Sequence, residues 1–127
     1  MAKWANDSAM DAMLQWIDDA DTLTVCSAQP TTYAEATSTY KLADVTLTAG
    51  DGGGDYTIAN GDVSGRKLTV AQQASVPIDS TGTATHVALC TVSGSVLRYV
   101  TTCTSQSLTS GGTVTVPAWD IEVADPT

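Results

Sequence analysis

Histidine and serine are the residue types that most often combine in catalysis, and this chain has a single histidine, His86. A serine nucleophile needs an imidazole base beside it and an acid that orients the base. His86 lies inside the apolar run Thr85–Val92, and the sequence has no G-x-S-x-G turn. The segment Ser93–Ser95 is typical of a hairpin turn, because its glycine tolerates a positive φ. We therefore expect His86 to be a structural residue on a sheet.

Carboxylates and phosphate-binding loops offer no better catalytic candidate. Glu35 and Glu122 are the only glutamates, and their flanks do not indicate the paired carboxylates of glycoside hydrolysis. The sequence also lacks a P-loop and a G-x-G-x-x-G motif. It therefore predicts no catalytic residue, no cofactor and no enzymatic activity.

The cysteines, Cys26, Cys90 and Cys103, form an odd set without C-x-x-C spacing. A structural zinc site needs four thiolate or imidazole ligands in close groups, and one histidine cannot complete such a set here. All three cysteines lie in β-type runs, where free cysteine behaves as a small apolar residue. We therefore predict buried or half-buried free thiols and no metal site.

A glycine-rich stretch, residues 50–65, carries three aspartates that raise a calcium hypothesis, because Ca²⁺ prefers carboxylate and carbonyl oxygens. These aspartates are Asp51, Asp55 and Asp62. The stretch partly matches the nonapeptide of calcium-binding β-rolls, but those sites need stacked repeats and this chain has one copy. The alternative is two turns around a short strand, Tyr56–Ala59, with a hairpin turn at Asn60–Gly61. We favour this structural interpretation.

The composition favours β-structure and excludes some partners. Thr and Ser make up about a quarter of the 127 residues, phenylalanine is absent, and threonine alternates with Val, Leu and Ile, as half-buried strands require. The net charge is −9, with five Lys and Arg in total. Binding a polyanion requires clustered Lys and Arg. We therefore expect neither nucleic acid nor a membrane surface as a partner.

One amphipathic helix is predicted over residues 6–20. Its apolar residues recur at i, i+3, i+4 and i+7, which places them on one stripe: Met10, Met13, Leu14 and Ile17. Trp4 and Trp16 lie off this stripe, where they either pack under the helix edges or anchor a partner subunit. The candidate partner interface is the set Trp4, Met10, Met13, Trp16 and Ile17.

The rest of the chain is predicted to form about seven short strands. A three-stranded antiparallel meander, Thr85–Val92, Val96–Thr101 and Thr113–Val123, should supply most of the core, with a two-residue turn at Ser93–Gly94 and a loop over 105–112. The other expected strands are Leu23–Ala28, Tyr40–Thr48, Tyr56–Ala59, Arg66–Ala71 and the edge-like Val76–Ile78, with a helical turn at Tyr33–Thr37.

Strands at this spacing are typical of an antiparallel β-sandwich or barrel-like domain with one N-terminal helix. Residues 1–127 are expected to form one domain, with the helix segment over 1–21 and the β-sandwich over 22–127. The N-terminus has no apolar core of signal-peptide type, and no run approaches the length of a membrane span. We expect synthesis and folding in the cytoplasm.

Several stretches of the chain together carry a family resemblance: LTVCSAQPTTYAEA (23–36), GTATHVAL (82–89), YVTTCTSQSLTSGGTVTVPAWDIEVADPT (99–127) and the opening MAKWANDSAMD (1–11). They resemble small structural proteins encoded in the head-and-tail gene clusters of tailed bacteriophages. Within this class, the small size and the acidic β-fold of the chain make it most similar to the capsid decoration (cement) proteins. The resemblance implies location on the capsid surface of the virion, with the major capsid protein and copies of the same chain, for example a trimer, as partners.

Two other functions stay open at this point. The first is a tail or neck component of the same virion. The second is a host-surface module that binds glycans by stacking aromatic residues on sugars, with Tyr33, Tyr40, Tyr56 and Trp119 as the candidates.

Overall fold

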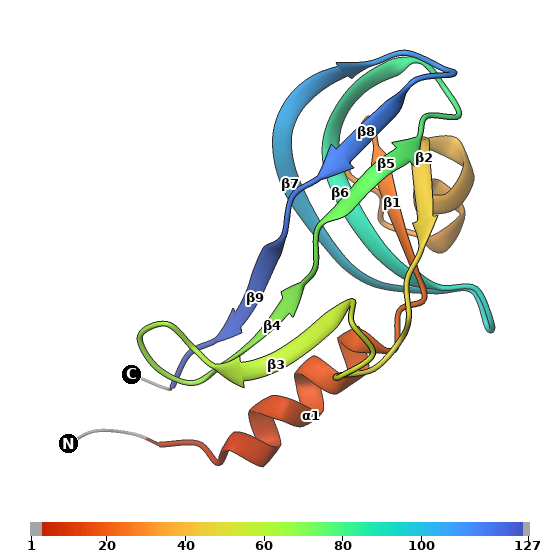
Figure 1. The fold of residues 1–127 in the computed structure, drawn as a ribbon. Coiled ribbons are helices and arrows are strands. Elements are labelled where there is room, and N and C mark those ends of the chain that lie inside the picture. Colours follow the sequence, from red (N-terminus) through yellow and green to blue (C-terminus); the bar gives the residue numbers. More distant parts are fainter. Residues whose placement is uncertain (1–3, 126–127) are drawn as a thin grey trace.

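The computed structural model describes residues 4–125 and is a mainly β domain with antiparallel sheets and one N-terminal α-helix (Figure 1). In chain order its elements are α1 (Asp7–Asp18), β1 (Thr22–Cys26), the π-helical turn η1 (Glu35–Thr39), β2 (Lys41–Thr46), β3 (Tyr56–Asn60), β4 (Arg66–Val70), β5 (Gln73–Pro77), β6 (Gly82–Thr91), β7 (Val96–Leu108), β8 (Thr113–Val116) and β9 (Trp119–Val123). The predicted fold class is confirmed, with nine strands in the described residues rather than about seven.

The strands form three antiparallel groups: a four-stranded sheet ordered β2-β1-β6-β7, a three-stranded sheet ordered β3-β4-β9, and the pair β5-β8. A bridge between Ala43 and Ile78 places the β5-β8 pair next to β2. The strands therefore follow one another around a barrel-like wall in the order β7-β6-β1-β2-β5-β8. The wall has an open seam, where β7 faces the β8–β9 segment without pairing to it.

This topology corrects the predicted meander. β7 pairs with β6 as expected, but the segment Thr113–Val123 does not return along β7. Instead β8 pairs with β5 and β9 pairs with β4. The cause lies in residues 109–112, where the amide of Gly111 donates to the carbonyl of Ile78 and the amide of Ile78 donates to the carbonyl of Gly112. These bonds turn the chain away from β7.

Three predicted loops also differ from the structure. Residues 105–108 were expected to be loop but extend β7, because Leu108 pairs with Gly82 at the start of β6. The β6–β7 turn has four residues rather than two, since Thr91 and Val96 form the closing pair. The β3–β4 loop covers residues 61–65 and is closed by the amide of Gly61 and the carbonyl of Gly65, so it is not a two-residue turn at Asn60–Gly61.

Helix α1 forms where its periodicity predicts and lies under the β3-β4-β9 sheet (Figure 1). The Asn6 Oδ1 atom accepts from the amide of Ser8 at 2.8 Å, which caps the first turn. The inward side of the helix buries Met10, Leu14 and Ile17. The guanidinium Nε of Arg66 in β4 donates to Asp11 Oδ1 at 2.7 Å, which fixes the helix to the sheet.

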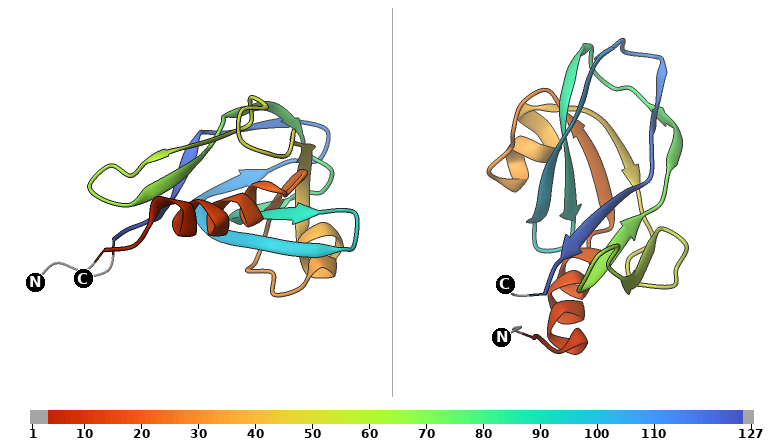
Figure 2. Two further views of the ribbon diagram at one scale, coloured as in Figure 1. Left: turned by 90° about the horizontal axis from the view of Figure 1, so that it is seen from below. Right: turned by 90° about the vertical axis from the view of Figure 1, so that its left-hand side faces the viewer.

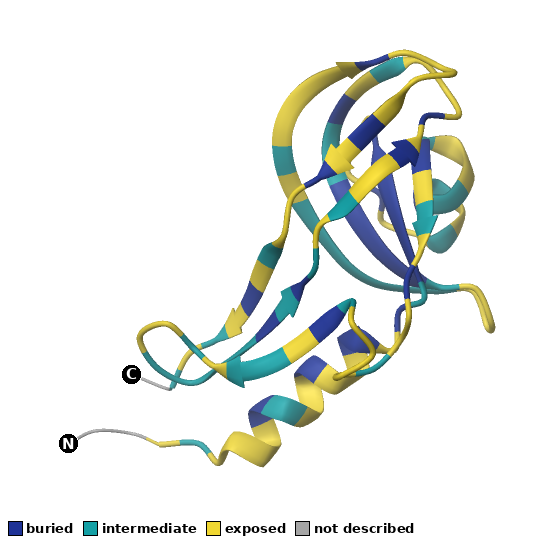
Figure 3. Ribbon diagram, viewed as in Figure 1, coloured by how far each residue is buried: buried dark blue, intermediate teal, exposed yellow. Residues whose placement is uncertain are grey.

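Two hydrophobic clusters hold the domain together. The larger lies between the strand groups and α1 and includes the fully buried Leu23, Leu68 and Tyr56. The smaller lies on the outer face of the four-stranded sheet, where η1 covers Ala88 and Cys90 (Figure 2). As a result β1 is buried along its whole length, whereas residues 104–107 of β7 are exposed (Figure 3).

Candidate functional site

The predicted partner interface divides into an inner and an outer set. Met10 and Ile17 pack in the core of the domain itself, so these two residues are not available to a partner. Trp4, Met13 and Trp16 are exposed by 74%, 53% and 50%. This division follows from the helical period. Residues at i, i+4 and i+7 form the side of the helix that packs on the sheet, and Met13 lies beside that side rather than on it.

The three exposed residues, Trp4, Met13 and Trp16, are called the helix-flank surface below. Met13 and Trp16 lie three residues apart and are neighbours on the helix. Arg98 of β7 holds Trp16 in place, because its guanidinium carbon lies 4.5 Å from the centre of the indole ring and its Nη1 donates to the Trp16 carbonyl at 2.7 Å. The indole is therefore half-exposed but fixed in orientation.

Asp18, the last residue of α1, is a buried carboxyl with 3% exposure. Burial, with smaller contributions from the charges of Asp19 and Asp51, raises its pKa to about 6. Its Oδ2 atom has no hydrogen-bond partner among the described residues. The backbone carbonyl of Asp18 accepts from the amide of Gly50 at 2.9 Å, so the helix end and the glycine-rich stretch are in contact.

The carboxylates of the glycine-rich stretch hold the stretch together rather than converging on one point. Asp51 Oδ1 accepts from the amide of Ile58 at 3.0 Å. Asp55 Oδ2 accepts from the amide of Thr48 at 2.7 Å, and Asp62 pairs with the Lys67 ammonium at 2.7 Å. No group of three or more His, Cys, Asp or Glu in residues 4–125 is arranged to hold a metal ion.

The remaining chemistry-bearing residues have structural surroundings. Cys26 and Cys90 are buried free thiols and Cys103 is a half-buried one, as the sequence predicts. Burial raises the pKa of Cys90 to about 11, which keeps that sulfur in the unreactive thiol form. His86 is half-buried on the sheet, and its Nδ1 lies 2.8 Å from the hydroxyl of Thr85. These contacts are those of a sheet, not of a catalytic triad.

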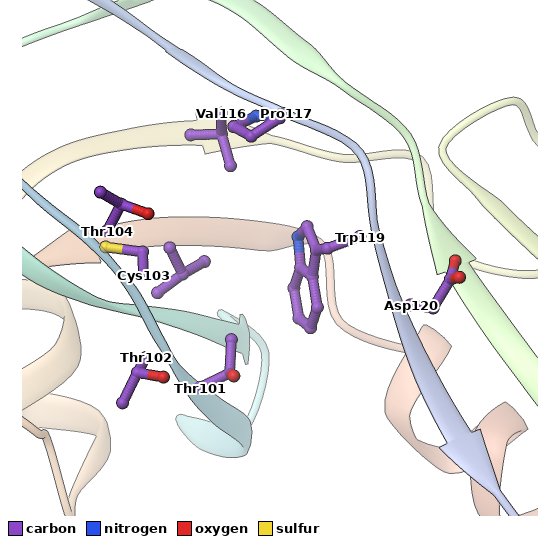
Figure 4. A pocket seen from close by; sticks show the side chains of 9 residues that line it. Thr101, Thr102, Cys103, Thr104, Val116, Pro117, Trp119 and Asp120 are labelled. Atoms are coloured by element: carbon purple, nitrogen blue, oxygen red, sulfur yellow. The ribbon is translucent and has the colours of Figure 1, made fainter.

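A cleft of about 560 Å³ lies at the open seam. Residues 101–104 of β7 line one side of the cleft, and Val87 of β6 also lines it. The β8–β9 segment contributes Val116, Pro117, Trp119 and Asp120. Figure 4 shows the Trp119 indole pointing from β9 into the cleft. The Tyr99 ring stacks on this indole, and the indole Nε1 is buried without a hydrogen-bond partner in the described part of the chain.

Sequence reasoning missed this cleft because it paired Thr113–Val123 with β7, which would have closed the seam. One signal was present in the sequence. Pro117 interrupts the segment and cannot donate to a ladder, which favours a bulge or a break at this position. The break separates β8 from β9 and directs each to a different neighbour.

Three of the four aromatic residues that were candidates for sugar stacking, Tyr33, Tyr56 and Trp119, do not share a surface, and Tyr40 directly follows η1. Tyr56 is fully buried, and its hydroxyl donates to the Ala20 carbonyl at 2.8 Å. Tyr33 packs on the outer cluster near η1, whereas Trp119 packs on the inner one. A ring that is buried or that belongs to the opposite face of a sheet cannot join one sugar-binding platform.

The fold and its surfaces define a barrel-like antiparallel β-domain with one packed helix, an exposed aromatic helix flank and a cleft at an open seam. No helix of residues 4–125 has the length and apolar character to span a membrane. Comparison with protein-family models, with curated proteins and with solved structures finds no significant match to the chain. The resemblance to phage virion proteins therefore stays a prediction from the sequence.

Proposed function

We propose that the chain is a non-enzymatic structural protein of a tailed-phage virion, a decoration protein that binds the outside of the capsid and stabilises the head. The observation that carries this proposal is the helix-flank surface. Met13 and Trp16 are exposed on a helix whose other side is fixed in the core, and Trp4 is exposed just before that helix begins. The sequence stretches that resemble phage head-and-tail proteins support the same class.

The helix-flank surface has the chemistry of a protein interface. Tryptophan is among the residues that most often dominate binding energy at interfaces, and methionine adapts to irregular partner surfaces. Leu14 and the Asp11–Arg66 ion pair hold the helix before any partner binds. A preformed surface loses less conformational entropy on binding, so more of the contact energy remains as affinity.

The partners in this proposal are the major capsid protein and further copies of this chain. A shell presents the same surface many times, so a symmetric homo-oligomer matches its repeated sites. Each specific contact would bury about 800 Å² per partner. The net charge of −9 directs the protein away from the packaged nucleic acid and towards the outer surface.

Binding of the purified protein to capsid shells that lack it tests the proposal. We expect the double variant Met13→Ser and Trp16→Ser to bind at least tenfold more weakly than the unmodified chain, because both residues leave the interface. The matched control is Val63→Ser in the β3–β4 loop, which removes an apolar residue that is 98% exposed. Thermal melting of each variant verifies that the fold is intact.

The contradicting results are equal capsid binding by the double variant and the unmodified chain, or assembly of the protein into tail-like rings or tubes instead of binding to shells. Removing residues 1–17 would be a poor test, because the deletion also removes Leu14 and Ile17 from the core. Substitution of exposed residues separates the loss of an interface from the loss of the fold.

A further inference from the structure

Both borders of the seam cleft are strand edges without a neighbour. β7 pairs with β6 alone, β8 with β5 alone and β9 with β4 alone. Alternate residues of an edge strand direct their N–H and C=O groups away from the paired side. Within residues 4–125 no further strand meets these outward groups. One continuous row of free backbone donors and acceptors, on β7, and a second row on β8 and β9 that is interrupted at Pro117 therefore border one cleft.

The cleft extends along the strands. It begins beside Thr101 and Trp119 and continues into a second hollow that reaches Gln106 on β7 and Val114 on β8. Five residues of extended chain separate Thr101 from Gln106, which corresponds to roughly 17 Å at the rise of a β-strand. The opening therefore has the length of a short strand.

The indole of Trp119 supplies an independent sign of a missing partner. Its Nε1 atom is buried and has no acceptor in the described residues. An indole N–H can only donate, and a buried donor without an acceptor destabilises the state that contains it. Figure 4 places this side chain in the cleft, between β7 and the β8–β9 segment. A strand added in the cleft supplies an acceptor once the indole turns towards it, because the Nε1 atom itself is shielded in the empty cleft.

The lining of the cleft carries a single charged residue, Asp120. This carboxylate points away from the cleft and accepts from the Thr69 hydroxyl at 2.8 Å (Figure 4). The other side chains are hydroxyl, thiol, amide, indole and apolar groups. Edge strands are normally protected by charged residues or proline. From Tyr99 to Leu108, β7 contains neither. This edge is therefore open to pairing, and an uncharged segment fits it.

We propose that the seam cleft binds an extended, uncharged segment of a partner polypeptide, which is added as a strand between β7 and the β8–β9 segment. Strand addition at an open sheet edge is a general mode of peptide recognition. Residues 4–125 have no unpaired extended arm to donate, so the segment comes from another protein rather than from a second copy. The proposal does not depend on a role in the virion.

A capped synthetic peptide of sequence KTVTVTVK is the probe. It presents uncharged β-branched residues in the centre and lysines at the ends, which suit a protein of net charge −9. We expect millimolar peptide to shift the NMR signal of the Trp119 indole N–H, identified by its loss in Trp119→Phe. We also expect slower hydrogen exchange at the backbone amides of residues 101–106. A peptide N-methylated at alternate residues should do neither, because it cannot complete the ladder.

Two variants of β7 locate the binding. Thr104→Arg places a large charged side chain at the cleft and should weaken peptide binding at least tenfold. Ser107→Arg makes the same change at an exposed β7 residue outside the cleft lining and should leave binding unchanged. Indole and amide signals that stay unchanged with peptide, or equal binding by both variants, would overturn the proposal. So would a dimer of the peptide-free protein that Thr104→Arg dissociates, since a second copy would then be the occupant.

Discussion

Tyr99 of β7 and Trp119 of β9 stack across the open seam, with ring centroids 6.0 Å apart and ring planes inclined by 24°. The two strands share no ladder, so this aromatic pair joins edges that the backbone leaves separate. Both residues belong to the periphery of the larger core cluster. The stack therefore closes the seam cleft at the end near β9, and it limits how far β7 and β9 can separate.

Removing the stack should destabilise the domain in a way that depends on both rings. In a double-mutant cycle with Tyr99→Ala and Trp119→Ala, we expect a coupling free energy of about 0.5–1.5 kcal/mol, the range of aromatic pairs. Urea unfolding of the four proteins measures it. The control is a second cycle with Tyr33→Ala and Trp119→Ala. These two residues belong to different clusters, so their effects on the free energy of unfolding should add. Additivity in the Tyr99 cycle would show that the rings do not interact in solution.

The buried Asp18 should make the domain less stable as pH rises through about 6. Its pKa increases from an ordinary 3.8 to about 6 on folding, so between these values the folded state holds the proton more tightly than the unfolded state. The stabilising effect of the bound proton is complete below pH 4 and is lost above pH 6. The shift corresponds to roughly 3 kcal/mol at neutral pH.

Asp18→Asn removes this titration while it keeps the shape of the side chain. We expect the variant to gain stability over the unmodified chain at pH 8, and the gain to shrink towards pH 4. Urea unfolding at several pH values measures the difference. Asp19→Asn, an exposed neighbour, should show a smaller change. A gain that is the same at every pH would contradict the assignment to the buried carboxyl.

Adjacent residues of α1 should respond very differently to truncation. Leu14 is fully buried, so Leu14→Ala should lower the free energy of unfolding by about 2–5 kcal/mol. Met13 is half-exposed on the helix flank, and Met13→Ala should change it by less than about 0.5 kcal/mol. Denaturant titration of both variants is the measurement. Similar losses in both would mean that the helix packs with another side inward.

Gly65 should not tolerate a side chain. Its φ is +72°, and a Cβ at this position would clash with the carbonyl oxygen of Val123. We expect Gly65→Ala to destabilise the domain by about 3 kcal/mol or more, from the left-handed backbone and the clash together. Gly111 has a φ of +91° but open space around it, so Gly111→Ala should lose only about 1–2 kcal/mol. Thermal melting of both variants tests this order.

Local patterns predicted the local elements of this fold. The helix begins and ends within two residues of its predicted bounds, because its period and its asparagine cap act over neighbouring residues. The β6–β7 hairpin also follows from adjacent apolar runs. The pairing of β8 and β9 could not be predicted in the same way. It depends on contacts of residues 109–112 with Ile78, which are distant in sequence.

The candidate surfaces show the same division. Trp16 could be placed off the buried stripe from the helix period, but its contact with Arg98 requires the position of β7. Met10 and Ile17 were assigned to a partner interface, although the same apolar stripe already indicated that they are buried within the domain. The seam cleft exists only because β7 has no partner strand on the edge opposite β6. This is a property of the tertiary fold, so no local sequence pattern indicates it.

Cryo-electron microscopy of a tailed-phage virion whose genome encodes this chain would test the proposed capsid role. We expect density for this domain at symmetric positions on the outer capsid surface, with Trp4, Met13 and Trp16 of the helix-flank surface against the major capsid protein. Density confined to the neck or tail, or contacts made by another face of the domain while this helix flank stays in solvent, would contradict it.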